Sequence, residues 1–147
     1  MSEFQGSGFS IELPENCIDA SSYTFVLEQH NGFSANLTIR FQLPTEGFSV
    51  SSFVDEQVSS LRTSLDSFAL IHQANGKRGE IEGAMFVYEW GQGSGRFKQK
   101  QVVMLSNLEP ARVYIMTSTD LAINADVSDP VFEQMMRSFA PNDTQLW

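Results

Sequence analysis

The chain has 147 residues, with 18 acidic and 9 basic side chains and a formal net charge of -9. The length predicts one domain, at about 150 residues per domain, and the hydrophobic share of 41% excludes a disordered chain. The acidic balance, without any cluster of Lys and Arg, excludes nucleic acid as a partner, and the single cysteine, Cys17, excludes an internal disulfide and a cysteine-based zinc site.

The first part of the chain alternates apolar and polar residues with a period of two, which is typical of β-strands. Strands are expected at 9–13, 23–29 and 34–42. The dipeptide Asn31-Gly32 separates the last two, and Asn-Gly between two alternating segments predicts a tight hairpin.

The spacing of apolar residues then changes to about 3.6, which predicts an amphipathic helix over 50–65 with Ser51 or Ser52 as its cap. Gln57 lies on the apolar stripe of this helix. A polar residue therefore stands where a core residue is expected.

Four more strands are expected after this helix, at 68–73, 80–90, 96–106 and 112–118. Turn residues separate them, at Asn75-Gly76, in the glycine-rich segment 91–95 and at 107–110. Consecutive strands with short connections predict an antiparallel meander.

A final helix is expected to begin at Asp129-Pro130, because Asp favours the cap position and Pro favours the first turn. Pro141 is expected to close it. We predict one domain over residues 1–141 and a C-terminal tail over 142–147.

The order of these elements predicts an α+β domain, with a single antiparallel sheet of about six to seven strands and two helices packed on it. Several strands carry apolar residues on both faces; Tyr23 and Phe25, for example, lie opposite Val26. An antiparallel sheet covered on one side has a polar second face. The second face of this sheet must therefore be covered too.

The sequence offers no catalytic, metal-binding or cofactor-binding site. His30 and His72 have no partner at metal-ligand or triad spacing. The glycine-rich segment 91–95 lies between two strands and predicts a hairpin turn, not a phosphate loop. Glu80 and Glu82 are expected to be solvated charges. We therefore expect a protein that is not an enzyme and uses no cofactor.

The N-terminal residues lack the basic and apolar regions of a signal peptide, and the longest apolar runs are too short to span a bilayer. We expect a cytoplasmic protein with no direct membrane anchoring.

Gln99 and Gln101 share one face of their expected strand with the apolar residues Phe97, Val103 and Leu105. Two interpretations are open. The glutamines face solvent, or they line a groove of the sheet that binds an apolar partner and satisfies the polar groups of that partner.

Several segments together resemble the DcrB/PsbP-like domains, and most of all the Eag (effector-associated gene) chaperones of bacterial type VI secretion. They are Phe9-Ser-Ile-Glu-Leu-Pro14, Asp19-Ala-Ser21, Gly83-Ala-Met-Phe-Val-Tyr-Glu-Trp90, Gln99-Lys-Gln101-Val-Val, Val113-Tyr-Ile-Met-Thr117 and Phe132-Glu-Gln-Met-Met-Arg-Ser-Phe139. The resemblance implies a PsbP/DcrB-like fold and a homodimer whose curved sheets enclose a hydrophobic groove.

The resemblance also implies a function. Proteins of this kind hold the N-terminal transmembrane segments of a secreted effector until it is loaded onto the secretion spike. Such segments need a chaperone, because about 20 consecutive apolar residues do not stay soluble alone. The alternative is a small-ligand or protein-binding module of the same fold without a secretion role.

The resemblance places the effector-binding groove at Tyr23, Phe25, Gln57 and Gln101, and we expect it to be lined in addition by Leu37, Gln99 and Val103. The chain departs from the family at Cys17, where many relatives have Trp. Tyr23 and Phe25 are also bulkier than the aliphatic residues expected in such a groove.

Overall fold

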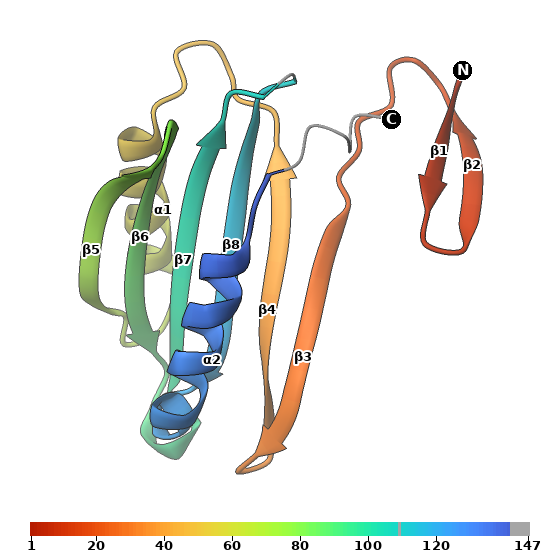
Figure 1. Ribbon diagram of the computed structural model, residues 1–147. Coiled ribbons are helices and arrows are strands. Elements are labelled where there is room, and N and C mark those ends of the chain that lie inside the picture. Colours follow the sequence, from red (N-terminus) through yellow and green to blue (C-terminus); the bar gives the residue numbers. More distant parts are fainter. Residues whose placement is uncertain (109, 142–147) are drawn as a thin grey trace.

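The computed structural model describes residues 1–108 and 110–141 (Figure 1). Over these residues the elements are, in chain order, β1 (Ser2–Gly6), β2 (Phe9–Leu13), β3 (Ser22–His30), β4 (Phe33–Gln42), α1 (Val50–Ser64), β5 (Ala69–Arg78), β6 (Ile81–Trp90), the 3-10 turn η1 (Gly93–Gly95), β7 (Phe97–Ser106), β8 (Arg112–Leu121), the 3-10 turn η2 (Ala122–Asn124) and α2 (Ala125–Ser138). The predicted tail at 142–147 lies outside the described residues.

Six strands form one antiparallel sheet in the order β3-β4-β8-β7-β6-β5. The expected meander is β5 to β8, and the β3-β4 hairpin joins it by pairing β4 with β8. The α+β class and the antiparallel sheet with two helices are therefore confirmed.

The first expected strand, β2, does not join this sheet. It pairs with β1 in a separate two-stranded sheet. The sequence analysis did not predict β1, because Phe4 is the only large apolar residue among Ser2–Gly6 and a single residue shows no alternation.

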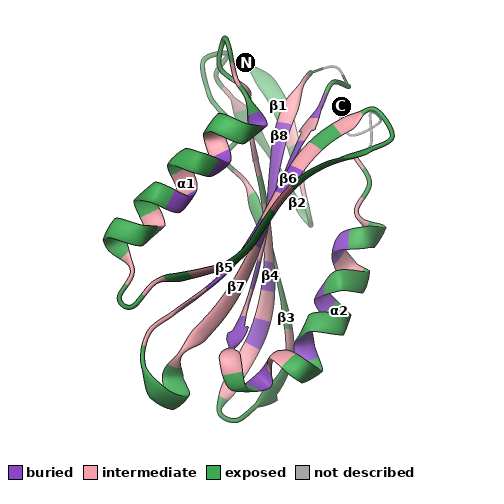
Figure 2. Ribbon diagram, turned by 90° about the vertical axis from the view of Figure 1, so that its left-hand side faces the viewer, coloured by how far each residue is buried: buried purple, intermediate pink, exposed green. Residues whose placement is uncertain are grey.

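The two helices cover opposite faces of the six-stranded sheet (Figure 2). α1 packs on β5, β6 and β7, and its buried valines lie over a core that includes Phe86, Tyr88 and Ile115. α2 packs on β8, and its Phe132 and Met136 lie over a second core that includes Leu37, Met104 and Met116. The sheet therefore has a core on each face, which explains the strands with apolar residues on both sides.

The β3-β4 hairpin turns at Asn31-Gly32, where φ is 52° and 78°. Positive φ at both positions is the requirement of a type I′ turn, which agrees with the prediction. Farther along, the pairing shifts by one residue between Val26 and Gln29, so that Phe25 lies opposite Leu37. A β-bulge of this kind changes the face on which the following side chains lie.

α1 begins at Val50, as expected, but its cap differs from the prediction. Ser49 is its cap, and the Ser49 side chain accepts a hydrogen bond from the Ser52 backbone N–H at 3.3 Å. The predicted caps, Ser51 and Ser52, lie inside the helix. The capping bond satisfies one of the N–H groups that the first turn leaves without a partner in the helix.

Asn75-Gly76 was predicted as a turn and is not one. β5 continues through it to Arg78, paired with β6 down to Arg78 opposite Ile81, and the chain turns at Gly79 with φ of 61°. Pairing with β6 outweighs the local turn preference of Asn-Gly. β8 likewise continues beyond Ser118 to Leu121.

α2 begins at Ala125, not at Asp129-Pro130, and Pro130 lies inside the helix. The earlier start adds a turn that buries Ser128, whose hydroxyl donates to the Asn124 carbonyl at 3.4 Å. The start of the helix is fixed by Asn124, whose Nδ2 donates to the His30 carbonyl at 3.0 Å, although Pro130 cannot make its backbone hydrogen bond.

Candidate functional site

The seven residues predicted to line a groove fall on opposite faces of the sheet. Gln99, Gln101 and Val103 alternate on β7 toward α1, the face where Val103 joins the core under that helix. Tyr23, Phe25 and Leu37 lie on the face of α2, because Phe25 pairs with Leu37 and Leu37 belongs to the core under α2. The single chain therefore does not bring the seven together.

Two of the seven are core residues. Leu37 has 2% of its surface exposed and Val103 has 0%. Both support the sheet from inside, so neither is part of an open surface. The remaining five divide into three glutamines on the α1 side of the sheet, of which Gln101 is also buried, and two exposed rings on the α2 face.

Gln101 is buried, with 8% of its surface exposed. Its Nε2 donates to the Tyr88 hydroxyl at 3.1 Å, whereas its Oε1 has no hydrogen-bond partner among the described residues. Rotating the amide by half a turn would only exchange which of the two atoms lacks a partner. The interpretation that Gln101 faces solvent is therefore wrong, and one end of its amide is buried without a hydrogen bond to the described residues.

The Tyr88 side chain is a fixed neutral partner for this amide. Burial raises the pKa of its hydroxyl, and the hydrogen bond from Gln101 offsets the rise only in part. The phenol is therefore protonated at neutral pH.

Gln99 differs from Gln101 because both ends of its amide are used. Its Oε1 accepts a hydrogen bond from Trp90 Nε1 at 2.8 Å, and its Nε2 donates to Thr119 Oγ1 at 2.8 Å. Gln99 thus links β6, β7 and β8, and it offers nothing to a partner unless these bonds break.

A row of hydroxyl groups extends from Gln101 toward the edge of the sheet. The strand register places Thr117 beside Gln101, Thr38 beside Thr117 and Thr24 beside Thr38. The last two hydroxyl oxygens lie 3.4 Å apart. We call Gln101 and these three threonines the polar row. α1 packs on β5, β6 and β7, so the part of the row on β3 and β4 is open.

Gln57 lies on the side of α1 that faces the polar row. Asp55 accepts a hydrogen bond from Gln73 of β5 at 3.5 Å, which places Asp55 on the β5 side of the helix. Two residues farther along, the helix has turned by about 200°. The half-buried Gln57 therefore points away from β5, toward β7 and β8.

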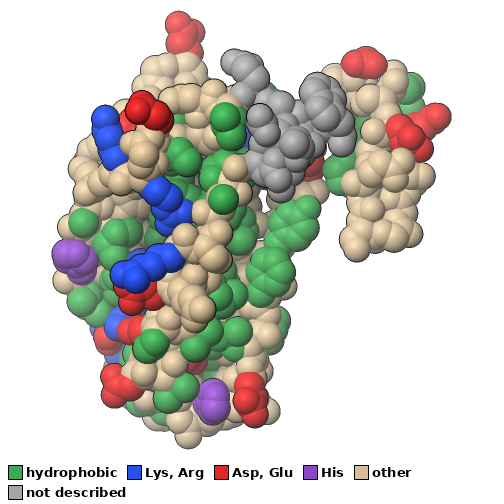
Figure 3. Space-filling view, viewed as in Figure 1, with side chains coloured by type: hydrophobic (Ala, Val, Ile, Leu, Met, Phe, Trp, Pro, Cys, Tyr) green, Lys and Arg blue, Asp and Glu red, His purple; other side chains and the backbone are tan. Residues whose placement is uncertain are grey.

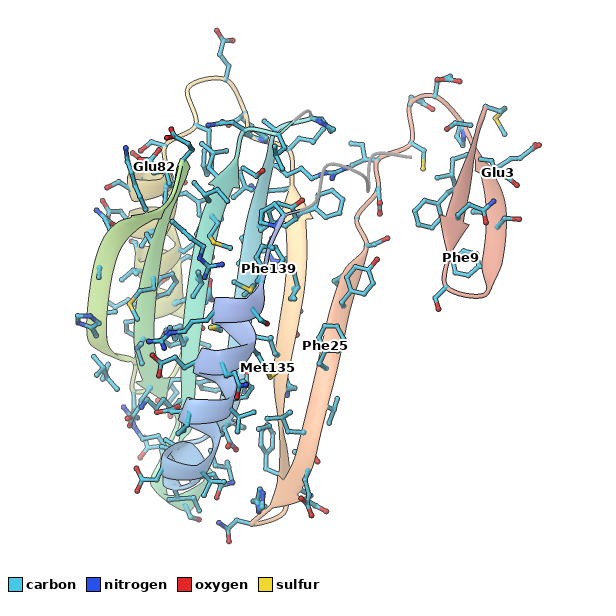
Figure 4. All side chains as sticks on the ribbon, in the orientation of Figure 1. Glu3, Phe9, Phe25, Glu82, Met135 and Phe139 are labelled. Atoms are coloured by element: carbon cyan, nitrogen blue, oxygen red, sulfur yellow. The ribbon has the colours of Figure 1, made fainter. Side chains whose placement is uncertain are left out.

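The opposite face carries an apolar groove of about 500 Å³ between β3, β4, β8 and the end of α2. We call it the aromatic groove; its apolar lining consists of Phe4, Tyr23, Phe25, Ile39, Phe41, Tyr114 and Phe139. Figure 3 shows hydrophobic side chains gathered along the β3 edge of the molecule, and Figure 4 shows Phe25 on β3 and Phe139 at the end of α2.

The rings of the aromatic groove are open at one end and packed at the other. Tyr23 is 62% exposed and Phe25 is 48% exposed. The Tyr114 ring, in contrast, is buried and lies 5.2 Å from the Phe139 ring and 6.2 Å from the Phe41 ring. The groove therefore has a rigid floor and an exposed apolar edge.

Arg112 supplies a positive charge to the aromatic groove. Its guanidinium lies 4.9 Å from the centre of the Phe41 ring. Its Nε is buried and has no hydrogen-bond partner among the described residues. A cation over a ring face is favourable, so this contact holds the guanidinium against the groove.

The sequence analysis missed Phe41, Tyr114, Phe139 and Arg112 as members of a site. Ile39 and Phe41 alternate with polar residues on β4, so the pattern gave them a common face. It did not say that this face is the one of Tyr23 and Phe25, because that depends on the bulge in β3.

The described residues were also compared with the requirements of a metal site and of a membrane span. Over residues 1–108 and 110–141, no group of three His, Cys, Asp or Glu side chains is placed to hold a metal ion. His30 and His72 are both exposed. In the same residues no helix is long and apolar enough to cross a membrane.

A family model described as DcrB matches residues 9–138. Among solved structures, the protein of unknown function PA94 from Pseudomonas aeruginosa is similar with a TM-score of 0.78 and 20% identity, over 97% of this chain and 97% of that one. The cyanobacterial PsbP (CyanoP) from Synechocystis is similar with a TM-score of 0.53 and 8% identity, over 93% of this chain and 100% of that one. No curated protein matches the chain significantly. The fold is therefore PsbP-like.

Proposed function

This chain belongs to the DcrB family, and we propose that it is a non-enzymatic, cytoplasmic chaperone of the Eag type. It would act as a homodimer that binds the N-terminal transmembrane segments of a type VI secretion effector and shields them before the effector is loaded onto the secretion spike.

The observation that carries this proposal is the aromatic groove. It presents exposed rings over a packed aromatic floor, whereas monomeric proteins seldom leave connected apolar surface uncovered. β3, which forms its open edge, has nine residues and so spans roughly 30 Å. A transmembrane helix of about 20 residues has the same length. The strand that carries Tyr23 and Phe25 is therefore long enough to lie along such a segment, although the groove itself occupies only the first part of it.

The size of the groove supports a dimer. A groove of about 500 Å³ accepts one face of a helix but cannot surround it, since a helix with its side chains is roughly 10–12 Å wide. Two copies would cover two faces of the same segment. Val26, on the other side of β3, is also 65% exposed, so this edge strand is apolar on both faces.

The polar row supplies the second element of a client site. Transmembrane helices that pack through small residues expose backbone carbonyls and hydroxyls at their contact surfaces. Gln57 and the hydroxyls of Thr24 and Thr38 can satisfy such groups, whereas the Gln101 amide oxygen is buried. Since the two surfaces lie on opposite faces of one sheet, a client would contact both only across two copies.

The test is capture of an effector's N-terminal transmembrane segment, fused to a soluble carrier and co-expressed with the chaperone. Phe25→Ser should lower the amount captured per folded chaperone by about tenfold or more, since it removes roughly 1.5–3 kcal/mol of apolar burial. Ile71→Ser on the far edge strand β5 is the matched control, because Ile71 is similarly exposed, at 51%. Equal capture by both variants would contradict the proposal.

The alternative, a small-ligand module of the same fold, is favoured by a cleft of about 240 Å³ between β7 and α2 that includes Lys98, Lys100 and Asp120. Lys98 Nζ is already bonded to Asp129 Oδ2 at 2.7 Å in this cleft. A small molecule retained by the purified chaperone in native mass spectrometry, together with no capture of the transmembrane segment, would support this alternative.

A further inference from the structure

The two N-terminal strands form an amphipathic hairpin, which we call the arm (residues 1–13). The pairs Phe4 with Ile11 and Gly6 with Phe9 lie on one face of it, together with Leu13. Glu3, Glu12 and Gln5 lie on the other face. The arm therefore has an apolar face and an acidic face. Figure 4 shows Phe9 and Glu3 on this hairpin, apart from the six-stranded sheet.

The apolar face of the arm is uncovered. Phe9 is 57% exposed and Ile11 is 51% exposed. Over the described residues, the hydrogen bonds of the arm stay within the arm and the linker that follows it, including the one from the N-terminal amine to Glu15 at 2.8 Å. An isolated two-stranded hairpin is at best marginally stable in water. The arm therefore needs a surface to pack on.

The aromatic groove matches the arm in chemistry. Phe4 and Gln5 border one end of the groove, so arm and groove are neighbours. The groove is lined by rings and contains Arg40 and Arg112 against one carboxylate, Asp19, whereas residues 1–15 carry three Glu and no Lys or Arg. Apolar surface would face apolar surface, and the negative arm and the two arginines would attract each other at longer range, because the Glu side chains lie on the outer face of the arm.

One chain leaves both surfaces open. The linker 14–21 joins the arm to β3 directly, yet Phe9 and Ile11 of the arm and Tyr23 and Phe25 of the groove all remain exposed in the single chain. A second copy of the same chain could cover both surfaces, because it is always present and carries one arm and one groove of its own. In a dimer with two-fold symmetry, two arms and two grooves bury each other in one arrangement.

We propose that the arm of each copy binds in the aromatic groove of the other. The arm is then the occupant of the groove when no client is bound, and it keeps the exposed rings from aggregating. This inference rests on the homodimer of the proposed function, but not on the identity of the client.

The experiment is a disulfide cross-link between two copies of the full chain. Both copies carry Cys17→Ser, which removes the only natural cysteine. One copy, with a short tag, carries Ile11→Cys in the arm, and the other, with a longer tag, carries Phe25→Cys in the groove. They are co-expressed without a client and oxidised, and the products are separated by mass. We expect a cross-linked pair that contains both tags.

Ile71→Cys replaces Phe25→Cys in the matched control, because it is similarly exposed but lies on the opposite edge strand. A mixed pair formed equally well with Ile71→Cys would overturn the inference. So would a chain with both Ile11→Cys and Phe25→Cys that cross-links only within itself, or arms that cross-link only after a client is added.

Light scattering separates failure of this inference from failure of the proposed dimer. A dimer that gives no mixed cross-link overturns the exchange of arms alone. A monomer overturns both.

Removing residues 1–13 provides a second measurement. The truncated chain should bind the dye ANS several-fold more strongly through its uncovered groove. Its circular dichroism should keep the signal of the six-stranded sheet. Unchanged dye binding would also overturn the inference.

Discussion

The two faces of the six-stranded sheet are each half covered by a helix, but the uncovered half is polar on one face and apolar on the other. Each is half covered by a helix, α1 through three valines and α2 through Phe132 and Met136. The uncovered half beside α1 is the polar row, whose Gln101 amide is half satisfied, and the uncovered half beside α2 is the aromatic groove. In the proposed chaperone the two surfaces would have different tasks: the groove would provide affinity through its apolar area, and the open end of the row would orient a client through hydrogen bonds.

The largest expected effect concerns the helix that borders the groove. Phe132→Ala should lower the free energy of unfolding by about 3–5 kcal/mol, because Phe132 is 3% exposed and fixes α2 to the sheet. Val54→Ala, at 0% exposed under α1, should cost about 2 kcal/mol, since it removes fewer buried groups. Urea unfolding measures both. Equal losses would show that the two helices are held by comparable contacts.

The next effect concerns the pair at the buried end of the polar row. Tyr88→Phe removes the partner of the Gln101 amide and should cost about 1–3 kcal/mol, because a buried polar group is left unsatisfied. Gln101→Leu leaves the Tyr88 hydroxyl without its hydrogen-bond partner in the same way. The double variant should recover most of the loss, because both polar groups are gone. A double-mutant cycle by thermal unfolding measures the coupling, and additive losses would contradict the pairing.

Most of the fold followed from the sequence pattern. The α+β class, the Asn31-Gly32 turn, the meander and both helices were predicted from periodicity and turn residues. The errors arose where tertiary contacts outweigh local signals. Pairing with β6 carries β5 through Asn75-Gly76, and the hydrogen bonds of Asn124 to the β3-β4 turn fix the start of α2 at Ala125.

The site was less predictable, because it depends on one residue of register. With the pairing set by the Asn31-Gly32 turn, Phe25 would lie opposite Thr38. The bulge in β3 places it opposite Leu37 instead and so on the face of α2. The alternation of apolar and polar residues does not reveal where a bulge lies. The sequence therefore could not show that Tyr23 and Phe25 lie on the face opposite Gln101. The sequence showed that Gln57 and Gln101 are polar residues among apolar neighbours. It could not show that one end of the Gln101 amide has no hydrogen-bond partner among the described residues.

A smaller effect is expected on binding at the polar row. Gln57→Ala should weaken capture of a transmembrane segment by about two- to tenfold, the equivalent of losing roughly 0.5–1.5 kcal/mol of hydrogen bonding. Its melting temperature should change little, because the side chain is only half buried. Gln99→Ala is the informative comparison, since Gln99 already uses both ends of its amide within the sheet and should lose stability instead. The reverse outcome would mean that Gln99, not Gln57, contacts the client.

The smallest expected effect is a pH dependence of the unfolding free energy that comes from Tyr88, on the α1 face of the sheet. Burial raises the pKa of Tyr88 above its ordinary value of 10.0. Between the unfolded and the folded pKa, the folded protein therefore binds a proton that the unfolded chain has released. Stability from this group is complete below pH 10 and is lost as the pH rises through the folded pKa. Tyr88→Phe should remove this part of the decline, so that the difference in unfolding free energy between wild type and variant narrows above pH 10, as measured by urea unfolding at pH 8 to 11. A difference that stays constant with pH would show that Tyr88 ionises as easily in the folded protein as in the unfolded chain, and hence that water reaches the buried end of the polar row.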